Sequence, residues 1–234
     1  MQLTTLSLIA SSFFGVGQSF IQGLDADDSV LSPDWEGAYR SGAHFTTIRA
    51  TSNDSEIDAD FEKNWADATD NHFIRAAVHH GRPDLTSGQE QAEFFLNNGG
   101  EWVANNMTLP GILEIRASKS GDKCYGLSGN ETLQFMNDWA TTYHDATDKK
   151  PIVRVNLDWF EDCAGHSYWP ATSYMAIFLE DGHPKPYRDM MLFYGESWLL
   201  WSNGDEYKHG GYSDVFNEDD LEYLRKFTRL GGDY

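Results

Sequence analysis

The chain has 234 residues, of which 17 are Lys or Arg and 37 are Asp or Glu, so its formal net charge at pH 7 is −20. Hydrophobic residues make up 40% and aromatic residues 14%, which is enough to bury a core and excludes a mainly disordered chain. Such a negative chain repels phosphate backbones and anionic lipid headgroups, so we expect no nucleic acid and no membrane among its partners.

The amino-terminal segment differs in composition from the rest. Residues 1–19 carry no charged side chain, and their apolar stretch is too short to span a bilayer. Small side chains at Gly17 and Ser19 suit cleavage before Phe20, so we predict a signal peptide over 1–19. A buried first strand is the alternative, because the segment lacks the Lys or Arg of a typical leader. No repeat or linker divides residues 20–234, which we expect to form one domain.

Short apolar or β-branched runs alternate with longer amphipathic segments along the chain, which predicts strands and helices in alternation. The predicted strands cover residues 20–25, 45–50, 74–79, 111–115, 152–156, 174–179 and 190–194. The predicted helices cover residues 32–41, 60–71, 88–97, 127–146 and about 218–230, and residues 203–212 read as a polar hairpin or loop. Since the helices thin out after residue 150, we expect an α/β barrel with an irregular last third.

In barrels of this kind the reacting groups lie at the carboxyl ends of the strands. That rule selects Asp25, Arg49, His79, Glu114, Arg116 and Asn156. Glu114 and Arg116 lie two residues apart on one predicted strand and therefore share a face, while Leu113 and Ile115 face the helices. We expect Glu114 and Arg116 to form a functional charged pair in the barrel mouth. The alternative is an internal salt bridge with a purely structural role.

Two further patterns agree with export from the cell. Cys124 and Cys163 are the two cysteines of the chain, and in an oxidising compartment an even pair predicts one disulfide. Sequons for N-glycosylation start at Asn53, Asn106 and Asn130. We therefore predict a secreted, extracellular glycoprotein. No zinc-type Cys/His spacing occurs, and we expect neither a metal nor a cofactor.

Motifs spread over nearly all of residues 20–234 follow one order: Gly23-Leu24-Asp25, Ile48-Arg49-Ala50-Thr51, Arg82-Pro83-Asp84, Cys124-Tyr125-Gly126-Leu127-Ser128, Asp158-Trp159-Phe160 with Cys163, and Asp214-Val215-Phe216-Asn217. In order and spacing they resemble glycoside hydrolase family 25, the N-acetylmuramidases or lysozymes that cleave bacterial peptidoglycan, and in particular its secreted fungal-type branch. The resemblance implies a single flattened TIM-like (β/α)5(β)3 barrel.

The same resemblance exposes a departure at the expected catalytic position. Active members carry Asp-x-Glu on the central strand, and the Glu is the catalytic acid. Here residues 113–116 read Leu-Glu-Ile-Arg, so Glu114 stands for the Asp and Arg116 for the acid. A guanidinium cannot release its proton near neutral pH, whereas glycoside hydrolysis needs a carboxylic acid. Asp25 and Asp214 remain, and we expect Arg116 to pair with Asp25, Glu114 or Asp214.

Other positions that the resemblance places against the sugar also differ. The family's Thr-Glu-Gly is replaced by residues 51–53 (Thr-Ser-Asn), a strand Tyr by Arg154, and the second aromatic of Tyr-His-Phe by His80. We expect the following residues to contact a ligand in the cleft: Arg49, His79, His80, Arg154 and Trp201.

These departures favour one function over two others. We expect a monomeric pseudoenzyme, catalytically impaired, that binds a peptidoglycan or chitin-like glycan. The first alternative is an active muramidase that hydrolyses β-1,4 bonds of peptidoglycan through Asp25, Glu114 and Asp214. The second alternative is a protein-binding scaffold or decoy.

Overall fold

The structure is a computed structural model that describes residues 20–26, 32–119, 121–165, 173–178 and 199–229. The predicted signal peptide and the predicted strand over 190–194 lie outside the described residues. The described strands are β1 (Ile21–Ala26), β2 (Ala43–Ser52), β3 (Glu56–Ile57), β4 (Ile74–His80), β5 (Ile112–Ile115), β6 (Ile152–Asn156), β7 (Tyr174–Phe178), β8 (Leu200–Glu206) and β9 (Tyr212–Phe216). The described helices are α1 (Trp35–Arg40), α2 (Phe61–Asp70), α3 (Gly88–Phe95), the π-helical turn η1 (Leu96–Gly100), α4 (Gly129–Thr147), α5 (Leu157–Ala164) and α6 (Leu221–Lys226).

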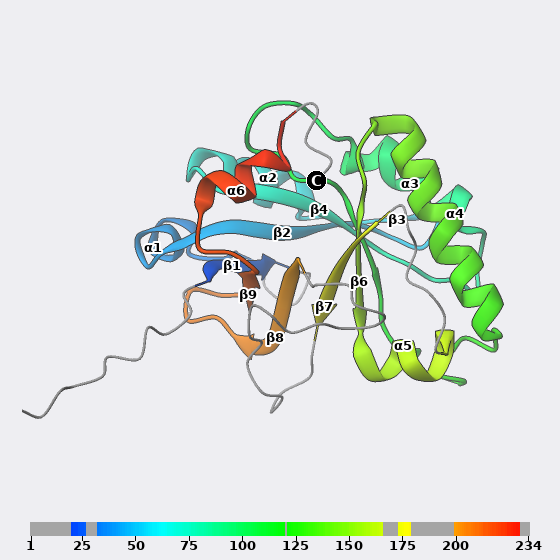
Figure 1. The fold of residues 1–234 in the computed structure, drawn as a ribbon. Helices are drawn as coiled ribbons and strands as arrows, with labels where there is room; N and C mark the ends of the chain where they lie inside the picture. Colours follow the sequence, from blue (N-terminus) through cyan, green and yellow to red (C-terminus); the bar gives the residue numbers. More distant parts are fainter. Residues whose placement is uncertain (1–19, 27–31, 120, 166–172, 179–198, 230–234) are drawn as a thin grey trace, which may run out of the picture.

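The strands form one sheet that closes on itself (Figure 1). Its order is β1-β9-β8-β7-β6-β5-β4-β2-β3, and an additional pairing of β1 with β2 closes the barrel. Neighbouring strands from β1 through β2 and β4 to β8 run parallel, whereas β9 runs antiparallel to both β8 and β1. The expected α/β barrel with an irregular last third is therefore confirmed.

The inner face of the barrel changes character along each strand. Ile112 of β5 and Ile152 of β6 belong to one apolar cluster. This cluster also contains Leu224 of α6 and Phe227, the residue directly after that helix. Two residues further along, at the carboxyl-terminal end, the same face presents charged side chains instead of apolar ones. The fold thus supplies an apolar floor beneath a charged mouth.

The outer face of the same strands packs against the helices. Leu113 of β5 and Val153 of β6 lie in one apolar cluster with Phe95 of α3 and Trp139 of α4. Figure 1 shows α3 and α4 lying against each other on this side of the barrel. The prediction that Leu113 faces the helices is confirmed.

Local capping explains where two of the helices begin. The predicted capping box at the start of α4 is present, because the Ser128 side chain accepts from the Glu131 backbone and Glu131 reaches back to Ser128. Helix α5 was not predicted, although Asn156 caps it by accepting a hydrogen bond from the Trp159 N–H at 3.1 Å. No helix among the described residues combines the length and the apolar character needed to cross a membrane.

The β8–β9 turn confirms the hairpin interpretation of residues 203–212. Its His209 ring lies 3.0 Å from Asp34 Oδ2 and 2.8 Å from Ser41 Oγ, at the two ends of α1. The contacts of His209 therefore attach the β8–β9 turn to both ends of α1.

Candidate active site

Four charged side chains fill the carboxyl-terminal end of the barrel interior, and we call them the charge cluster: Asp25 of β1, Glu114 of β5, Arg154 of β6 and Asp214 of β9. Arg154 Nη2 lies 3.0 Å from Asp25 Oδ2 and also pairs with Glu114, and Arg154 Nη1 lies 3.4 Å from Asp214 Oδ2. All four residues are at most 4% exposed. The three carboxylates that the sequence selected are thus brought together around one guanidinium.

Strand register produces this arrangement. Residues His80, Glu114 and Arg154 are neighbours across β4, β5 and β6, so their side chains form one row on the inner face. Thr47 of β2 lies opposite Asp25 in the register, and its Oγ1 is 2.6 Å from Asp25 Oδ1. Sequence reasoning missed Thr47, because an isolated threonine on a strand gives no signal until the neighbouring strand is known.

Arg116 lies at the outer side of the charge cluster. It forms an ion pair with Glu114, which confirms the pairing expected from the sequence. Its side chain is 38% exposed, whereas that of Glu114 is fully buried. His80 also approaches Glu114, with Nε2 3.4 Å from Oε1. Among the described residues, Arg116 and His80 therefore lie on the outer side of Glu114 and are more exposed than it is.

The central cation is Arg154, and the sequence had placed it among the ligand-binding residues. Its side chain is 1% exposed and contacts carboxylates from three strands. The alternation of Ile152, Arg154 and Asn156 on β6 already put Arg154 on the inner face. What the sequence could not provide is the register that sets this side chain beside Glu114.

The two best-buried carboxyl groups have opposite pKa shifts. Burial opposes ionisation of Glu114, but Arg116 and Arg154 outweigh it and hold the pKa of Glu114 well below its usual value. Burial and the nearby charge of Asp25 raise the pKa of Asp214 to about 7, against the opposing effect of Arg154. Near neutral pH, Glu114 is therefore ionised, whereas Asp214 populates both its protonated and its ionised form.

The remaining predicted ligand residues occupy different environments. Arg49 pairs with Asp58, with Nη2 2.8 Å from Oδ2, and its side chain is 12% exposed. His79 is buried on the helix side of β4, where it lies 2.8 Å from Thr51 Oγ1 and 3.1 Å from Gln91 Oε1. Trp201 is buried in the apolar cluster between strands and helices. Of this group, His80 is the residue that shares the mouth with Arg116.

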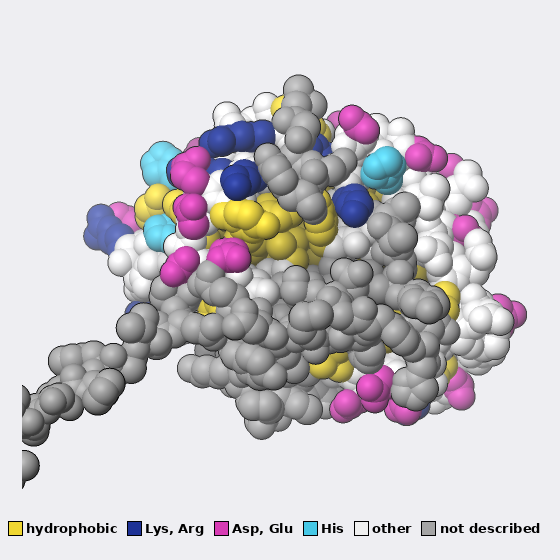
Figure 2. Space-filling view, in the orientation of Figure 1, with side chains coloured by type: hydrophobic (Ala, Val, Ile, Leu, Met, Phe, Trp, Pro, Cys, Tyr) yellow, Lys and Arg dark blue, Asp and Glu magenta, His cyan; other side chains and the backbone are white. Residues whose placement is uncertain are grey.

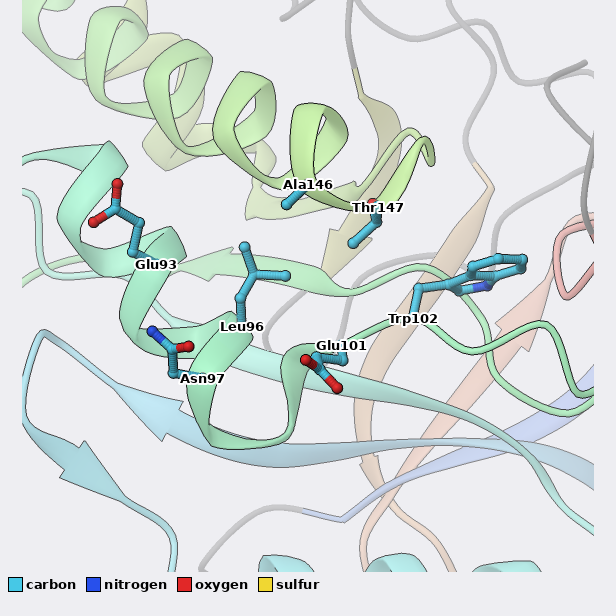
Figure 3. A pocket seen from close by; sticks show the side chains of 7 residues that line it. All are labelled: Glu93, Leu96, Asn97, Glu101, Trp102, Ala146 and Thr147. Carbon is cyan, nitrogen blue, oxygen red and sulfur yellow. The ribbon is translucent and has the colours of Figure 1, made fainter.

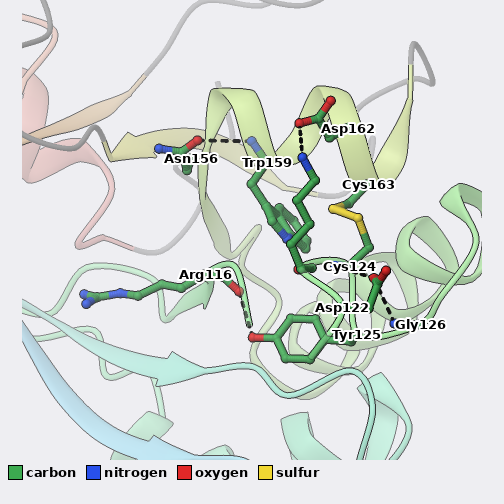
Figure 4. Close-up of a disulfide and its surroundings, with 10 residues drawn as sticks. Arg116, Asp122, Cys124, Tyr125, Gly126, Asn156, Trp159, Asp162 and Cys163 are labelled. Atoms are coloured by element: carbon green, nitrogen blue, oxygen red, sulfur yellow. Dashed lines mark hydrogen bonds and ion pairs between the residues drawn. A yellow bond between two sulfur atoms is a disulfide. The ribbon is translucent and has the colours of Figure 1, made fainter. Parts of the chain in front are cut away.

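The loop that carries Arg116 is fixed from outside the barrel (Figure 4). The predicted disulfide is present, and Cys124 and Cys163 join this loop to α5 with their Cα atoms 5.2 Å apart. The Tyr125 hydroxyl donates to the Arg116 carbonyl at 2.7 Å, and Trp159 Nε1 donates to the Lys123 carbonyl at 2.9 Å. These contacts hold the backbone of the loop while the Arg116 side chain extends away from the disulfide.

A pocket of about 630 Å³ lies elsewhere, between the end of α3, η1 and the end of α4 (Figure 3). It is lined by Glu93, Leu96, Asn97, Glu101, Trp102, Ala146 and Thr147. None of these residues belongs to the charge cluster.

Across the described residues, no group of three or more His, Cys, Asp or Glu side chains is placed to hold a metal ion. Acidic side chains are scattered over the visible surface, in keeping with the net charge (Figure 2).

Comparison with known proteins gives a consistent result. The sequence profile of glycosyl hydrolases family 25 matches residues 27–208. The N,O-diacetylmuramidase of Arthroderma benhamiae is 30% identical over 218 residues, which cover 90% of this chain and 88% of the relative. The N,O-diacetylmuramidase of Chalaropsis is 29% identical over 214 residues, covering 89% of this chain and 99% of that protein.

Solved structures agree with these sequence matches. A family GH25 lysozyme from Aspergillus fumigatus superposes with a TM-score of 0.83 at 32% identity, covering 90% of this chain and all of that one. A muramidase from Acremonium alcalophilum gives a TM-score of 0.81 at 33% identity, with 91% of this chain and 100% of that chain covered. The barrel fold of this chain is therefore shared with solved family 25 structures.

Proposed function

Because the chain belongs to glycosyl hydrolases family 25, we propose that it is a pseudoenzyme that binds a glycan in its barrel mouth without cleaving it. Members of this family bind peptidoglycan, and a peptidoglycan or chitin-like glycan is the ligand that we propose. The observation that carries the proposal is the pairing of the buried Glu114 with two guanidinium groups, those of Arg116 and Arg154.

The chemistry of glycoside cleavage supports this proposal. Hydrolysis uses one carboxylic acid to protonate the leaving oxygen and a second carboxylate that attacks or stabilises the sugar. Arg116 cannot supply the proton, and Glu114 is held ionised because the pKa of this carboxyl is lowered by Arg116 and Arg154 despite burial. Loss of general acid catalysis alone lowers a rate by roughly 10²–10⁴-fold.

The position of Arg154 adds a second obstacle. Its guanidinium contacts Asp25 and Asp214 as well as Glu114, so the negative charge that would stabilise an oxocarbenium-like transition state is already paired with a cation. Any carboxylate that did face a sugar would do so beside this positive charge. We therefore expect binding and catalysis to be separated in this protein.

An active muramidase that uses Asp25, Glu114 and Asp214 is the second candidate. It is favoured by one observation: the pKa of Asp214, raised to about 7 by burial and by Asp25, makes this carboxyl a proton donor near neutral pH. Asp214 is 1% exposed and its Oδ2 lies 3.4 Å from Arg154 Nη1, however, so a glycosidic oxygen would have to enter the charge cluster to reach it.

The compartment and assembly state are part of the same proposal. The Cys124–Cys163 bridge fits an oxidising compartment, and together with the uncharged leader over 1–19 it supports secretion. We infer that the chain acts outside the cell as a monomer.

The test restores the missing carboxyl groups. The purified protein is expected to sediment with insoluble peptidoglycan while releasing no reducing ends and leaving a bacterial cell-wall suspension turbid between acidic and neutral pH. The variant Glu114→Asp/Arg116→Glu/Arg154→Tyr, which replaces both guanidinium groups, is expected to gain clearing activity. Arg40→Glu is the control for the Arg-to-Glu charge reversal, because Arg40 lies on α1 with a side chain that is 76% exposed. Robust clearing by the unaltered protein would overturn the proposal.

A further inference from the structure

One of the three sequons lies at the edge of the charged mouth. Strand β2 ends at Ser52, which pairs with His80 at the end of β4, and the Asn53 N–H donates to the His80 carbonyl at 3.0 Å. His80 in turn contacts Glu114, which pairs with Arg116. The backbone of Asn53 is therefore bonded to that of His80, whose side chain contacts the carboxylate that pairs with Arg116.

The side chain of Asn53 is hydrogen-bonded within its own turn. Asn53 has a φ of 50°, and its Oδ1 accepts from the Ser55 N–H at 2.8 Å and from the Ser55 hydroxyl at 2.9 Å. The oxygen of the amide is thus occupied by the third residue of the sequon. The nitrogen has a contact at 3.5 Å with Glu56 Oε2, and the residues from Asp54 to Glu56 are exposed. A sugar on this nitrogen would be bordered by the exposed residues 54–56 of the turn.

The sequon at Asn106 provides an internal comparison. It precedes β5, and the adjacent Met107 carbonyl accepts from the Arg75 N–H near the start of β4, so it lies at the amino-terminal end of the strands. Asn106 is exposed, and its Oδ1 accepts from Arg229 Nε at 3.1 Å. A glycan on Asn106 would stand at the end of the barrel opposite the mouth.

We propose that Asn53 carries an N-linked glycan that stands over the mouth and restricts access to Arg116. In this modification, the Asn53 Nδ2–C1 bond to the first sugar forms as the C1–O bond of a lipid-pyrophosphate-linked oligosaccharide donor breaks, and one amide proton is released. The attached chain is bulky and hydrophilic, and its root lies one residue beyond the strand that pairs with His80. The proposal rests on the secretion inferred above, and it adds a control on which ligands reach the mouth.

The experiment uses the full chain secreted from a eukaryotic host. Peptide mass spectrometry measures sugar occupancy at Asn53, and labelling with an arginine-selective dicarbonyl reagent measures access to Arg116. Asn53 is expected to be occupied, and Asn53→Gln is expected to raise Arg116 labelling severalfold. Asn106→Gln is expected to leave it unchanged, and labelling of the exposed Arg40 is the reference in each sample.

Trimming the glycans of the folded wild-type protein with an endoglycosidase repeats the comparison without a substitution, so a folding defect of Asn53→Gln cannot imitate the result. An unmodified Asn53, or equal labelling of Arg116 with and without its glycan, would overturn the proposal. Neither readout needs turnover or a bound wall polymer. Cell-wall clearing would therefore overturn the pseudoenzyme assignment while leaving this result intact.

Discussion

The two faces of the sheet formed by β4, β5 and β6 have different surroundings. His79 points to the helices and stacks on Trp139 with ring centroids 6.0 Å apart, whereas its neighbour His80 points inward to Glu114. We call the helix side of these strands, with the aromatic side chains of α3 and α4, the helix-facing wall. At the level of Glu114 the wall contains uncharged side chains such as Leu113 and Val153, whereas the inner face carries the charge cluster. The comparison teaches that one set of strands carries both the packing that forms the barrel and the buried charges that define the mouth.

The largest effect is expected from removing the central cation of the inner face. Arg154→Met leaves Asp25, Glu114 and Asp214 buried without their shared guanidinium. Loss of one partner of a buried ion pair lowers the free energy of unfolding by about 3–5 kcal/mol. Urea unfolding at pH 7 followed by circular dichroism measures this change.

Arg116→Met is the matched control for that variant. Arg116 is 38% exposed, and Glu114 keeps Arg154 when Arg116 is removed, so we expect a loss of about 1 kcal/mol or less. Equal losses in the two variants would contradict the assignment of Arg154 as the centre of the cluster.

The next effect concerns the disulfide that joins α5 to the loop carrying Arg116. The Cys124→Ser/Cys163→Ser variant removes a disulfide with a sequence separation of 39 residues, and the chain-entropy account predicts a loss of about 3–4 kcal/mol in the free energy of unfolding. Denaturant unfolding of the oxidised and reduced wild type should show the same difference. Reduction should leave the variant unchanged, and a wild type that is insensitive to reduction would contradict the prediction.

The wall was the part of the fold most open to prediction from sequence. Its strands alternate apolar residues with period two, and Ser128 with Glu131 marks the start of α4, so local patterns decide these elements. Helix α5 was missed because its eight residues follow a strand without a break, and Asn156 ends one element while capping the next.

The centre of the site was less accessible to that reasoning. Residue types at strand ends identified Asp25 and Glu114, and the family resemblance added Asp214. The sequence indicated Arg116 as their cation, whereas the alignment of β5 and β6 places Arg154 between them. Register is a tertiary property, set by packing across the sheet. The sequence therefore indicates which carboxylates meet and that Arg116 pairs with one of them, and the structure adds Arg154 as the cation in the middle.

The third effect is the pH dependence of the free energy of unfolding. We expect it to have opposite signs for His79 in the wall and Asp214 on the inner face. Burial lowers the pKa of His79 in the wall to about 4, so between pH 4 and 6.5 the unfolded chain binds more protons and the fold loses stability as pH falls. The loss is about 3 kcal/mol across this window, and His79→Gln should remove it. Urea unfolding at pH 4.5 and 6.5 measures the difference for each protein.

Asp214 on the inner face gives the opposite sign. Burial and Asp25 raise the pKa of Asp214 to about 7, so the folded chain binds more protons and loses stability as pH rises from about 4 to 7. Asp214→Asn should therefore make stability rise more steeply with pH, whereas His79→Gln should make it rise less. Shifts of the same sign in both variants would contradict the division between wall and mouth.

The smallest effect compares one tyrosine from each region. Tyr125→Phe removes the donor to the Arg116 carbonyl, a contact of a half-buried side chain, so we expect a loss of about 1 kcal/mol or less. Tyr143 lies fully buried in the wall, and its hydroxyl accepts from the Gly111 N–H at 2.7 Å. Tyr143→Phe leaves that buried N–H unpaired and should cost about 1–3 kcal/mol. Thermal and urea unfolding rank the two variants, and Tyr125→Phe should in addition raise dicarbonyl labelling of Arg116, because the loop backbone loses a tether. If Tyr125→Phe proved the more damaging change, the mouth would be the more tightly held region, and its chemistry could not vary independently of the barrel.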